Sequence, residues 1–105
     1  MVVAAAGSNA NQIDGADYIF KDDEGNLLIA DRNNNRIQKW PPSKHYGITI
    51  AGGNGAGTAL NQFDQAYGCF ADKRGFIYVA DHENDRVLRF KLKDDDDFCN
   101  EHKDI

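Results

Sequence analysis

The sequence predicts an all-β protein, because a segment of short apolar strands and polar turns is written twice. Residues 16–40 recur as residues 66–90 without a gap, so equivalent positions lie fifty residues apart. Each copy alternates apolar runs with turns rich in Gly, Asn and Asp. An internal period of about 40–50 residues with four short antiparallel strands is typical of a β-propeller blade. The predicted fold is therefore two four-stranded antiparallel β-propeller blades.

Four strands are expected in the first copy, residues 16–51. Tyr18 and Phe20 are two residues apart, which is the period of a strand with one covered face. Residues 26–31 include a continuous apolar run that the second copy repeats, and such a run favours a strand covered on both faces. Two prolines end the third strand, since proline cannot donate to a sheet. The expected strands are residues 17–22, 26–31, 36–40 and 47–51.

The residues between these strands suit tight turns. Gly25 and Gly75 precede the second strand of each copy, where a short hairpin with a bulge needs a left-handed residue. Residues 33–35 are three asparagines, which tolerate positive φ. The turn that contains them sets an aspartate opposite an arginine, a cross-strand pair that contributes about 0.2–1 kcal/mol. We interpret both pairs as hairpin contacts rather than catalytic groups. They are Asp31 with Arg36 and Asp81 with Arg86.

The second blade, residues 66–92, is expected to lack its fourth strand. An acidic stretch follows at residues 93–105, and its four consecutive aspartates repel one another, which is typical of a solvated tail. Residues 52–65 form an inter-blade loop in this interpretation. Residues 1–15 are expected to contain an outer strand at 2–5 and then a polar loop.

The composition limits the kinds of partner. The chain of 105 residues has a net charge of −5, and its basic residues are interspersed with acids, so a nucleic-acid partner is not expected. No apolar run reaches the roughly 20 residues that cross a bilayer, so no membrane contact is expected. Cys69 and Cys99 are too few for a disulfide framework and are interpreted as unrelated thiols rather than a bridge. The cysteines therefore do not indicate a cellular compartment.

Two turns, residues 32–35 and 82–85, form the candidate binding face. Antiparallel strands place alternate loops at alternate ends, so these turns share one end with the loop at 52–65. Four of their polar residues differ between the copies and protrude, which favours contact with a ligand or partner. The competing interpretation is that they are ordinary solvated turn residues. The four candidates are Arg32, Asn33, His82 and Glu83.

Other motifs indicate little chemistry. The glycine-rich run at 52–57 would suit phosphate only if a helix followed, and the next segment shows no helical period, so we interpret it as a connection. His45, His82 and His102 lie too far apart in the repeat to share a metal. Residues 94–97 lack the ligand spacing of an EF-hand. No catalytic residue, metal site or cofactor is predicted.

The repeated segment resembles the NHL repeat family. The family pattern combines G-N-L-Y-V-A-D with N-x-R-I-Q-K-F, and residues 25–31 and 33–40 match it in order. The second copy keeps Gly75 and residues 77–81 of the pattern. Tyr18 stands where the family has glycine, and both copies lack the proline that usually precedes the first strand. The resemblance implies two blades of a ring of about six.

The resemblance also implies a function: a non-catalytic binding or scaffold module that presents a loop face to a protein or a small ligand. One alternative is a metal-dependent enzyme similar to the peptidylglycine amidating lyase. In that family a zinc histidine stands where this chain has Asn35 and Asp85, so the ligand is not carried over. The other alternative is an RNA-binding NHL domain, which uses a basic face that this sequence does not show.

Two blades cannot close a ring, so a homo-oligomer is expected to complete it. In this hypothesis the strand at residues 2–5 pairs with the open second blade of a neighbouring copy. Three copies would then form a closed trimer, and closure removes exposed sheet edges.

Overall fold

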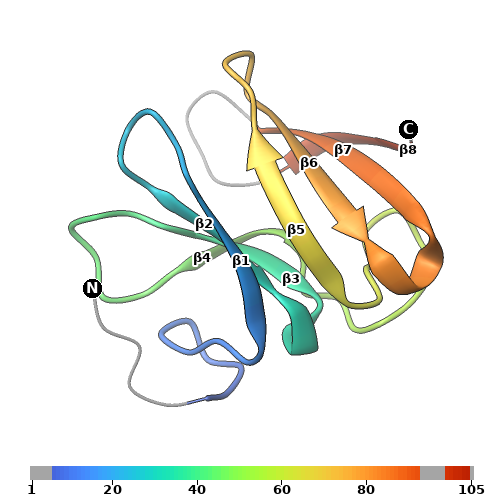
Figure 1. Cartoon of the computed structure of the whole chain (residues 1–105), viewed down its shortest axis with the longest axis horizontal. Helices are drawn as coiled ribbons and strands as arrows, with labels where there is room; N and C mark the ends of the chain where they lie inside the picture. The colour runs from blue at the N-terminus through green and yellow to red at the C-terminus, as the bar shows by residue number, and fades with distance from the viewer. Residues whose placement is uncertain (1–5, 93–98, 105) are drawn as a thin grey trace.

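The computed structural model describes residues 6–92 and 99–104, and its strands form two antiparallel sheets (Figure 1). Sheet 1 has the order β1-β2-β3-β4 and sheet 2 the order β5-β6-β7-β8, so each is a simple meander. The strands are β1 (Ala16–Lys21), β2 (Leu27–Asp31), β3 (Arg36–Trp40), β4 (Ile48–Gly52), β5 (Ala66–Ala71), β6 (Phe76–Asp81), β7 (Arg86–Leu92) and β8 (Cys99–Asp104). Two 3-10 turns, η1 (Arg32–Asn34) and η2 (His82–Asn84), follow β2 and β6.

Sheet 1 forms where the sequence predicts it. The bounds of β3 are those expected, and each bound of the other three strands lies within one residue of its expected position. Gly25 and Gly75 have φ of 85° and 88°, so the left-handed residue expected before each second strand is present. The predicted cross-strand pairs also form, because Asp31 lies opposite Arg36 and the second copy repeats this register.

Sheet 2 has a fourth strand, and the prediction that this strand is missing is wrong. β8 pairs with β7, from Leu88 opposite Asp104 to Leu92 opposite Cys99. The prediction relied on the four consecutive aspartates that precede this strand, and the strand's own sequence, CNEHKD, is polar as well. An edge strand needs a backbone partner on one side only, so polar residues can form it. Part of the expected acidic tail is therefore a strand, and it occupies the edge that the trimer hypothesis left open. The expected strand at 2–5 and the aspartates at 94–97 lie outside the described residues.

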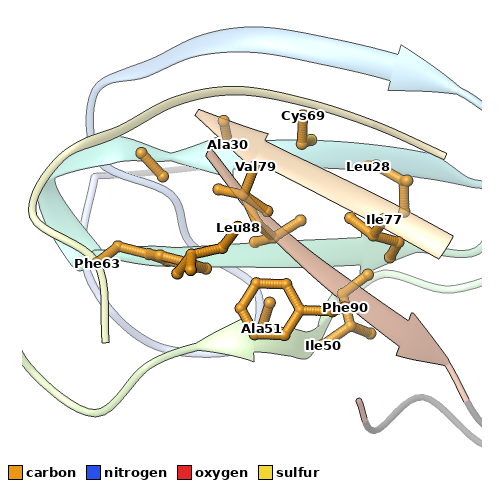
Figure 2. Packing of buried hydrophobic residues seen from close by; sticks show 12 residues of the cluster. Leu28, Ala30, Ile50, Ala51, Phe63, Cys69, Ile77, Val79, Leu88 and Phe90 are labelled. Carbon is orange, nitrogen blue, oxygen red and sulfur yellow. The ribbon is translucent and has the colours of Figure 1, made fainter. Parts of the chain in front are cut away.

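One face of each sheet packs against the other sheet, and we call these the inner faces (Figure 2). Sheet 1 contributes Leu28, Ala30 and Ile37, while sheet 2 contributes Cys69, Ile77, Val79, Leu88 and Phe90. Phe63 enters from the loop between the sheets and meets Phe90 edge to face, with ring centroids 5.6 Å apart at 87°. Burial of apolar area at about 25 cal/mol per Å² makes this layer the main stabilising contact between the sheets.

The apolar runs of β2 and β6 differ in whether one or both of their faces are buried. In sheet 1, Leu28, Ile29 and Ala30 are all buried, as expected for a strand covered on both faces. In sheet 2, Val79 is buried but its neighbour Ala80 is exposed. The expectation that the second run is covered on both faces is therefore wrong: only the inner face of sheet 2 is covered in the part of the chain that the structure describes.

A carboxylate organises the turn between β5 and β6. Asp72 accepts hydrogen bonds from the backbone N–H groups of Arg74 (2.9 Å) and Phe76 (3.2 Å). The Tyr78 hydroxyl and the Arg74 guanidinium also donate to it, each at 3.0 Å. Desolvation opposes ionisation, but these hydrogen bonds outweigh it and lower the pKa of Asp72 from 3.8 to about 2.

This depressed pKa predicts a specific loss of stability in acid. A carboxylate whose pKa is lower in the folded state stabilises the fold above its unfolded pKa, and the effect is lost as the pH falls through the folded value. Between about pH 4 and pH 2 the melting temperature of the wild type should therefore fall more steeply than that of Asp72→Asn. Thermal unfolding followed by circular dichroism at several pH values measures both slopes. Equal slopes would contradict this role for Asp72.

Gly52 lies where the end of β4 meets the loop that carries Phe63. Its φ is 73°, and a Cβ atom there would overlap the carbonyl oxygen of Asn35 and lie 2.7 Å from the Phe63 ring. Gly55 has a similar φ of 80° but no heavy atom near its Cβ position. Gly55→Ala should cost about 1–2 kcal/mol for the left-handed backbone alone. Gly52→Ala should cost about 1–3 kcal/mol more from overpacking, measured by urea unfolding. Equal costs would show that the contact relaxes freely.

Candidate functional site

A buried carboxylate in each repeat ties the preceding loop to the 3-10 turn. Asp31 is fully buried and accepts hydrogen bonds from the Arg36 guanidinium (2.7 Å), the Asn34 side chain (3.0 Å) and the backbone N–H of Asp14 (2.7 Å). Arg36 donates further bonds to the carbonyl oxygens of Ser8, Asn9 and Gln12, and Asn34 donates to that of Gly7. The aspartate thus orients two donors that hold the loop by its backbone.

The second repeat builds the same network fifty residues later. Asp81 is fully buried and accepts from Arg86 (2.8 Å), Asn84 (2.9 Å) and the backbone N–H of Asp64 (2.7 Å). Arg86 donates to the carbonyl oxygens of Thr58, Ala59 and Gln62. The sequence predicted the Asp–Arg pairs as hairpin contacts. It did not reveal that these pairs anchor a distant loop. The signal that could have shown this is that Asp, Asn and Arg recur with the same spacing in both copies.

These anchored loops place η1 and η2 at one end of the two sheets. The backbone N–H of Asn33 donates to the carbonyl of Asp14 (3.0 Å), and that of Glu83 donates to Asp64 (3.1 Å). The turn at η2 therefore lies against the loop between the sheets, as the alternation of loop ends predicts. All four candidate residues are on these two turns, and His45, in the loop after β3, lies at the other end of sheet 1.

Tyr67 connects the two turns and was not predicted as part of the site. Its ring stacks on the imidazole of His82, with centroids 4.1 Å apart and planes at 5°. On sheet 1, the Arg32 guanidinium carbon lies 5.5 Å from the Tyr67 ring centroid. Arg32 and His82, from different sheets, therefore meet on one aromatic ring. The register shift between Ala66 and Gly68 is a bulge, which re-aims a side chain in a way that periodicity cannot show.

Two acidic side chains lie beside this stack. Arg32 forms an ion pair with Asp17 (3.1 Å), and His82 Nδ1 lies 2.9 Å from a Glu83 carboxylate oxygen. Asn33 stands apart from the stack, because its side chain donates to Asp14 (3.2 Å). The structure thus brings together three of the four candidates. We call Arg32, Tyr67, His82 and Glu83 the turn cluster.

The turn cluster offers recognition chemistry. A guanidinium presents a fixed fork of donors that suits a carboxylate or phosphate, and an aromatic ring beside it accepts a flat ligand face. The Nε of Arg32 is buried and has no hydrogen-bond partner, while the Arg32 side chain as a whole is 30% exposed. These groups can bind and orient a partner, and the cluster holds no nucleophile paired with a base.

The other residues and motifs considered in the sequence analysis have structural roles or lie in the core. Asn35 and Asp85, both at φ 51°, cap the 3-10 turns in the left-handed conformation, and Asn35 accepts a bond from the backbone N–H of Gln65 (2.8 Å). The glycine-rich run leads into a bridge between Ala56 and Phe63 rather than a helix. Burial raises the pKa of the Cys69 thiol to about 12. Within residues 6–92 and 99–104, no three His, Cys, Asp or Glu side chains gather as metal ligands would.

No protein-family model matches this chain, and no curated protein matches it with significance. In the part of the chain that the structure describes, no helix has the length and hydropathy needed to cross a membrane.

Proposed function

We propose that the two sheets are consecutive blades of an NHL-type β-propeller that serves as a non-catalytic binding module. Two four-stranded meanders that pack face to face, with a fifty-residue repeat and the matching G-N-L and N-x-R motifs, support this proposal. The binding face is the end that carries η1 and η2. Its partner is a protein or a small ligand.

The observation that carries the proposal is the turn cluster. Arg32 of sheet 1 and His82 of sheet 2 both lie against Tyr67, so the binding face spans the junction between the blades. The buried Asp31 and Asp81 fix the two turns, which pre-organises the cluster and lowers the entropic cost of binding. Propeller loops at this end are where the family resemblance places ligands.

A fragment screen followed by NMR tests the binding face. Isotope-labelled protein is titrated with small aromatic carboxylates, which match a guanidinium beside an aromatic ring. We expect shift changes concentrated on the backbone amides of Arg32, Tyr67 and His82. The double variant Arg32→Ala/Tyr67→Ala should weaken binding at least about tenfold, a loss typical of an anchoring aromatic and arginine.

Arg74→Ala is the matched control, because Arg74 is an exposed arginine at the opposite end of sheet 2 that pairs with Asp72. It should leave the titration unchanged. Fragments that bind elsewhere, or that bind the double variant as well as the wild type, would contradict the proposal. The enzyme alternative makes a different prediction, since stoichiometric zinc in the purified protein would favour a lyase-like propeller.

A further inference from the structure

The loop between β4 and β5 contains an asparagine that is followed directly by a glycine, Asn54 and Gly55 (Figure 1). This pair of residue types occurs once in the sequence. Both residues are exposed to solvent. The side chain of an asparagine can react with the next backbone nitrogen, and a glycine there leaves the approach open because it has no Cβ. The surroundings of the pair decide whether the folded chain allows this reaction.

The backbone nitrogen of Gly55 is free to act as a nucleophile. Its N–H group donates to no acceptor within residues 6–92 and 99–104. Its φ is 80°, and no heavy atom lies within 4 Å of the position that a Cβ would occupy, so this peptide group is open to water and base. The neighbouring Gly53 differs, because its N–H donates to the carbonyl oxygen of Asn35 (2.9 Å).

The side-chain amide of Asn54 is the group that this nitrogen would attack. Its Nδ2 donates to the carbonyl oxygens of Asn61 (2.9 Å) and Gly52 (3.3 Å). The Gln62 side chain donates in turn to the backbone carbonyl of Asn54 (3.0 Å). Asn54 therefore ties the end of β4 to the far side of the loop. All three bonds are exposed to solvent, so they can open without unfolding of the sheets.

We propose that Asn54 is a site of spontaneous deamidation in the folded protein. The Gly55 nitrogen forms a bond to Cγ of Asn54, the bond from Cγ to Nδ2 breaks, and the Gly55 proton leaves with the amide nitrogen as ammonia. Water then opens the resulting cyclic succinimide. Aspartate forms when the new bond to Cγ breaks, and isoaspartate forms when the bond to the main-chain carbonyl carbon breaks. Water is the only co-reactant.

The reaction weakens the loop that the second arginine holds. A carboxylate at position 54 lacks the amide donor and places negative charge beside the two carbonyl oxygens that Asn54 binds. An isoaspartate also lengthens the main chain by one carbon. The next residues of this loop include Thr58 and Ala59, whose carbonyl oxygens accept from Arg86. The modified loop therefore presents these acceptors less firmly.

Only the second repeat carries this site. The first repeat has two alanines, Ala4 and Ala5, at the positions fifty residues before the pair. The other exposed asparagine of the same loop, Asn61, is followed by Gln62, whose side chain hinders attack by its nitrogen. Deamidation would therefore make the two repeats chemically different as the protein ages.

Incubation of the folded protein at mildly alkaline pH, followed by peptide mass spectrometry, tests the proposal. The wild type should gain about 1 Da at Asn54, the change that replaces an amide by a carboxylic acid. Labelling by an isoaspartate methyltransferase should detect the isoaspartate product. Gly55→Ala should react at least about tenfold more slowly, because its Cβ hinders the nitrogen. Asn54→Gln should not react at that position, and Asn61 is the internal control that should stay unmodified.

The same incubation in urea separates reaction in the folded loop from reaction after unfolding. We expect the folded rate to lie within about tenfold of the unfolded rate, because the loop opens locally. A folded rate at least about a hundredfold lower would overturn the proposal, since the pair would then react only on unfolding. A wild type that keeps Asn54 intact would also overturn it, as would a Gly55→Ala chain that reacts as fast as the wild type.

Asn54→Asp tests the structural consequence, because it supplies one product of the reaction directly. Its melting temperature should be lower than that of the wild type. An unchanged melting temperature would contradict the proposed weakening of the loop. Circular dichroism of each variant confirms that it is folded. None of these measurements uses a ligand, so their outcome is independent of the proposed binding function.

Discussion

Asp81→Ala is expected to lower the free energy of unfolding by about 3–5 kcal/mol, because it leaves the largely buried Arg86 without its charged partner. The carboxylate is fully buried and accepts from Arg86, Asn84 and the backbone N–H of Asp64. All three donors lose their acceptor at once. Urea unfolding followed by circular dichroism measures the loss. A stability of about 5–15 kcal/mol for a domain of this size makes the change severe.

Asp17→Ala is the control for this prediction, since Asp17 also pairs with an arginine but at the surface. The side chains of Asp17 and Arg32 are 44% and 30% exposed, so solvent screens their attraction. An exposed ion pair contributes about 0–1 kcal/mol. Equal losses from the two variants would show that Asp81 acts as a surface charge rather than as an anchor.

Phe63→Ala should destabilise the protein by about 3–5 kcal/mol, the usual cost of removing a buried phenylalanine. Phe63 is fully buried and its ring meets Phe90 edge to face between the sheets. Its loss opens a cavity where the connecting loop is held against the core. The same unfolding measurement reports the change, and Phe63→Leu should lose markedly less because most of the volume remains.

The equivalent residue of the first repeat supplies the comparison. Ile13 occupies the same position in its loop and makes the same type of bridge, but it is only half-buried. Ile13→Ala should therefore cost less than Phe63→Ala, about 1–2 kcal/mol. A larger loss at Ile13 would mean that the contact between the sheets contributes little at Phe63.

Local signals in the sequence were sufficient for most of the strands. The turn residues around β3 are asparagines before it and prolines after it, so both of its ends were predictable. The Asp31–Arg36 register followed from the length of the turn. Such features depend on residues a few positions apart, and the chemistry of each turn selects its geometry.

Features that depend on distant contacts were not predictable. β8 is a polar edge strand whose only requirement is the open edge of β7, so no apolar period marks it. Ala80 is exposed because residues 6–92 and 99–104 form no third sheet beside sheet 2, whereas its own run of residues resembles that of Ala30.

In the candidate site, too, features set by nearby residues were predictable and features set by distant contacts were not. Arg32 and His82 were predictable as protruding turn residues, because loops at one end of an antiparallel sheet lie together. Tyr67, which joins them, owes its direction to the bulge at the start of β5. Asn33 was expected beside them but bonds to Asp14 in its own loop. Sequence variation between the copies therefore identified the face but not its contacts.

The aspartate anchors also set limits on how such a chain can be duplicated. Because Arg86 holds the backbone of residues 58–62, a copy that began at β5 would inherit the arginine without the loop it binds. Gly57 to Arg86 has to be inherited as one piece, and Gly7 to Arg36 likewise. A join between ancestral copies in the stretch from residue 37 to residue 56 keeps both blocks whole, whereas a join inside either block would separate an arginine from the loop that it binds.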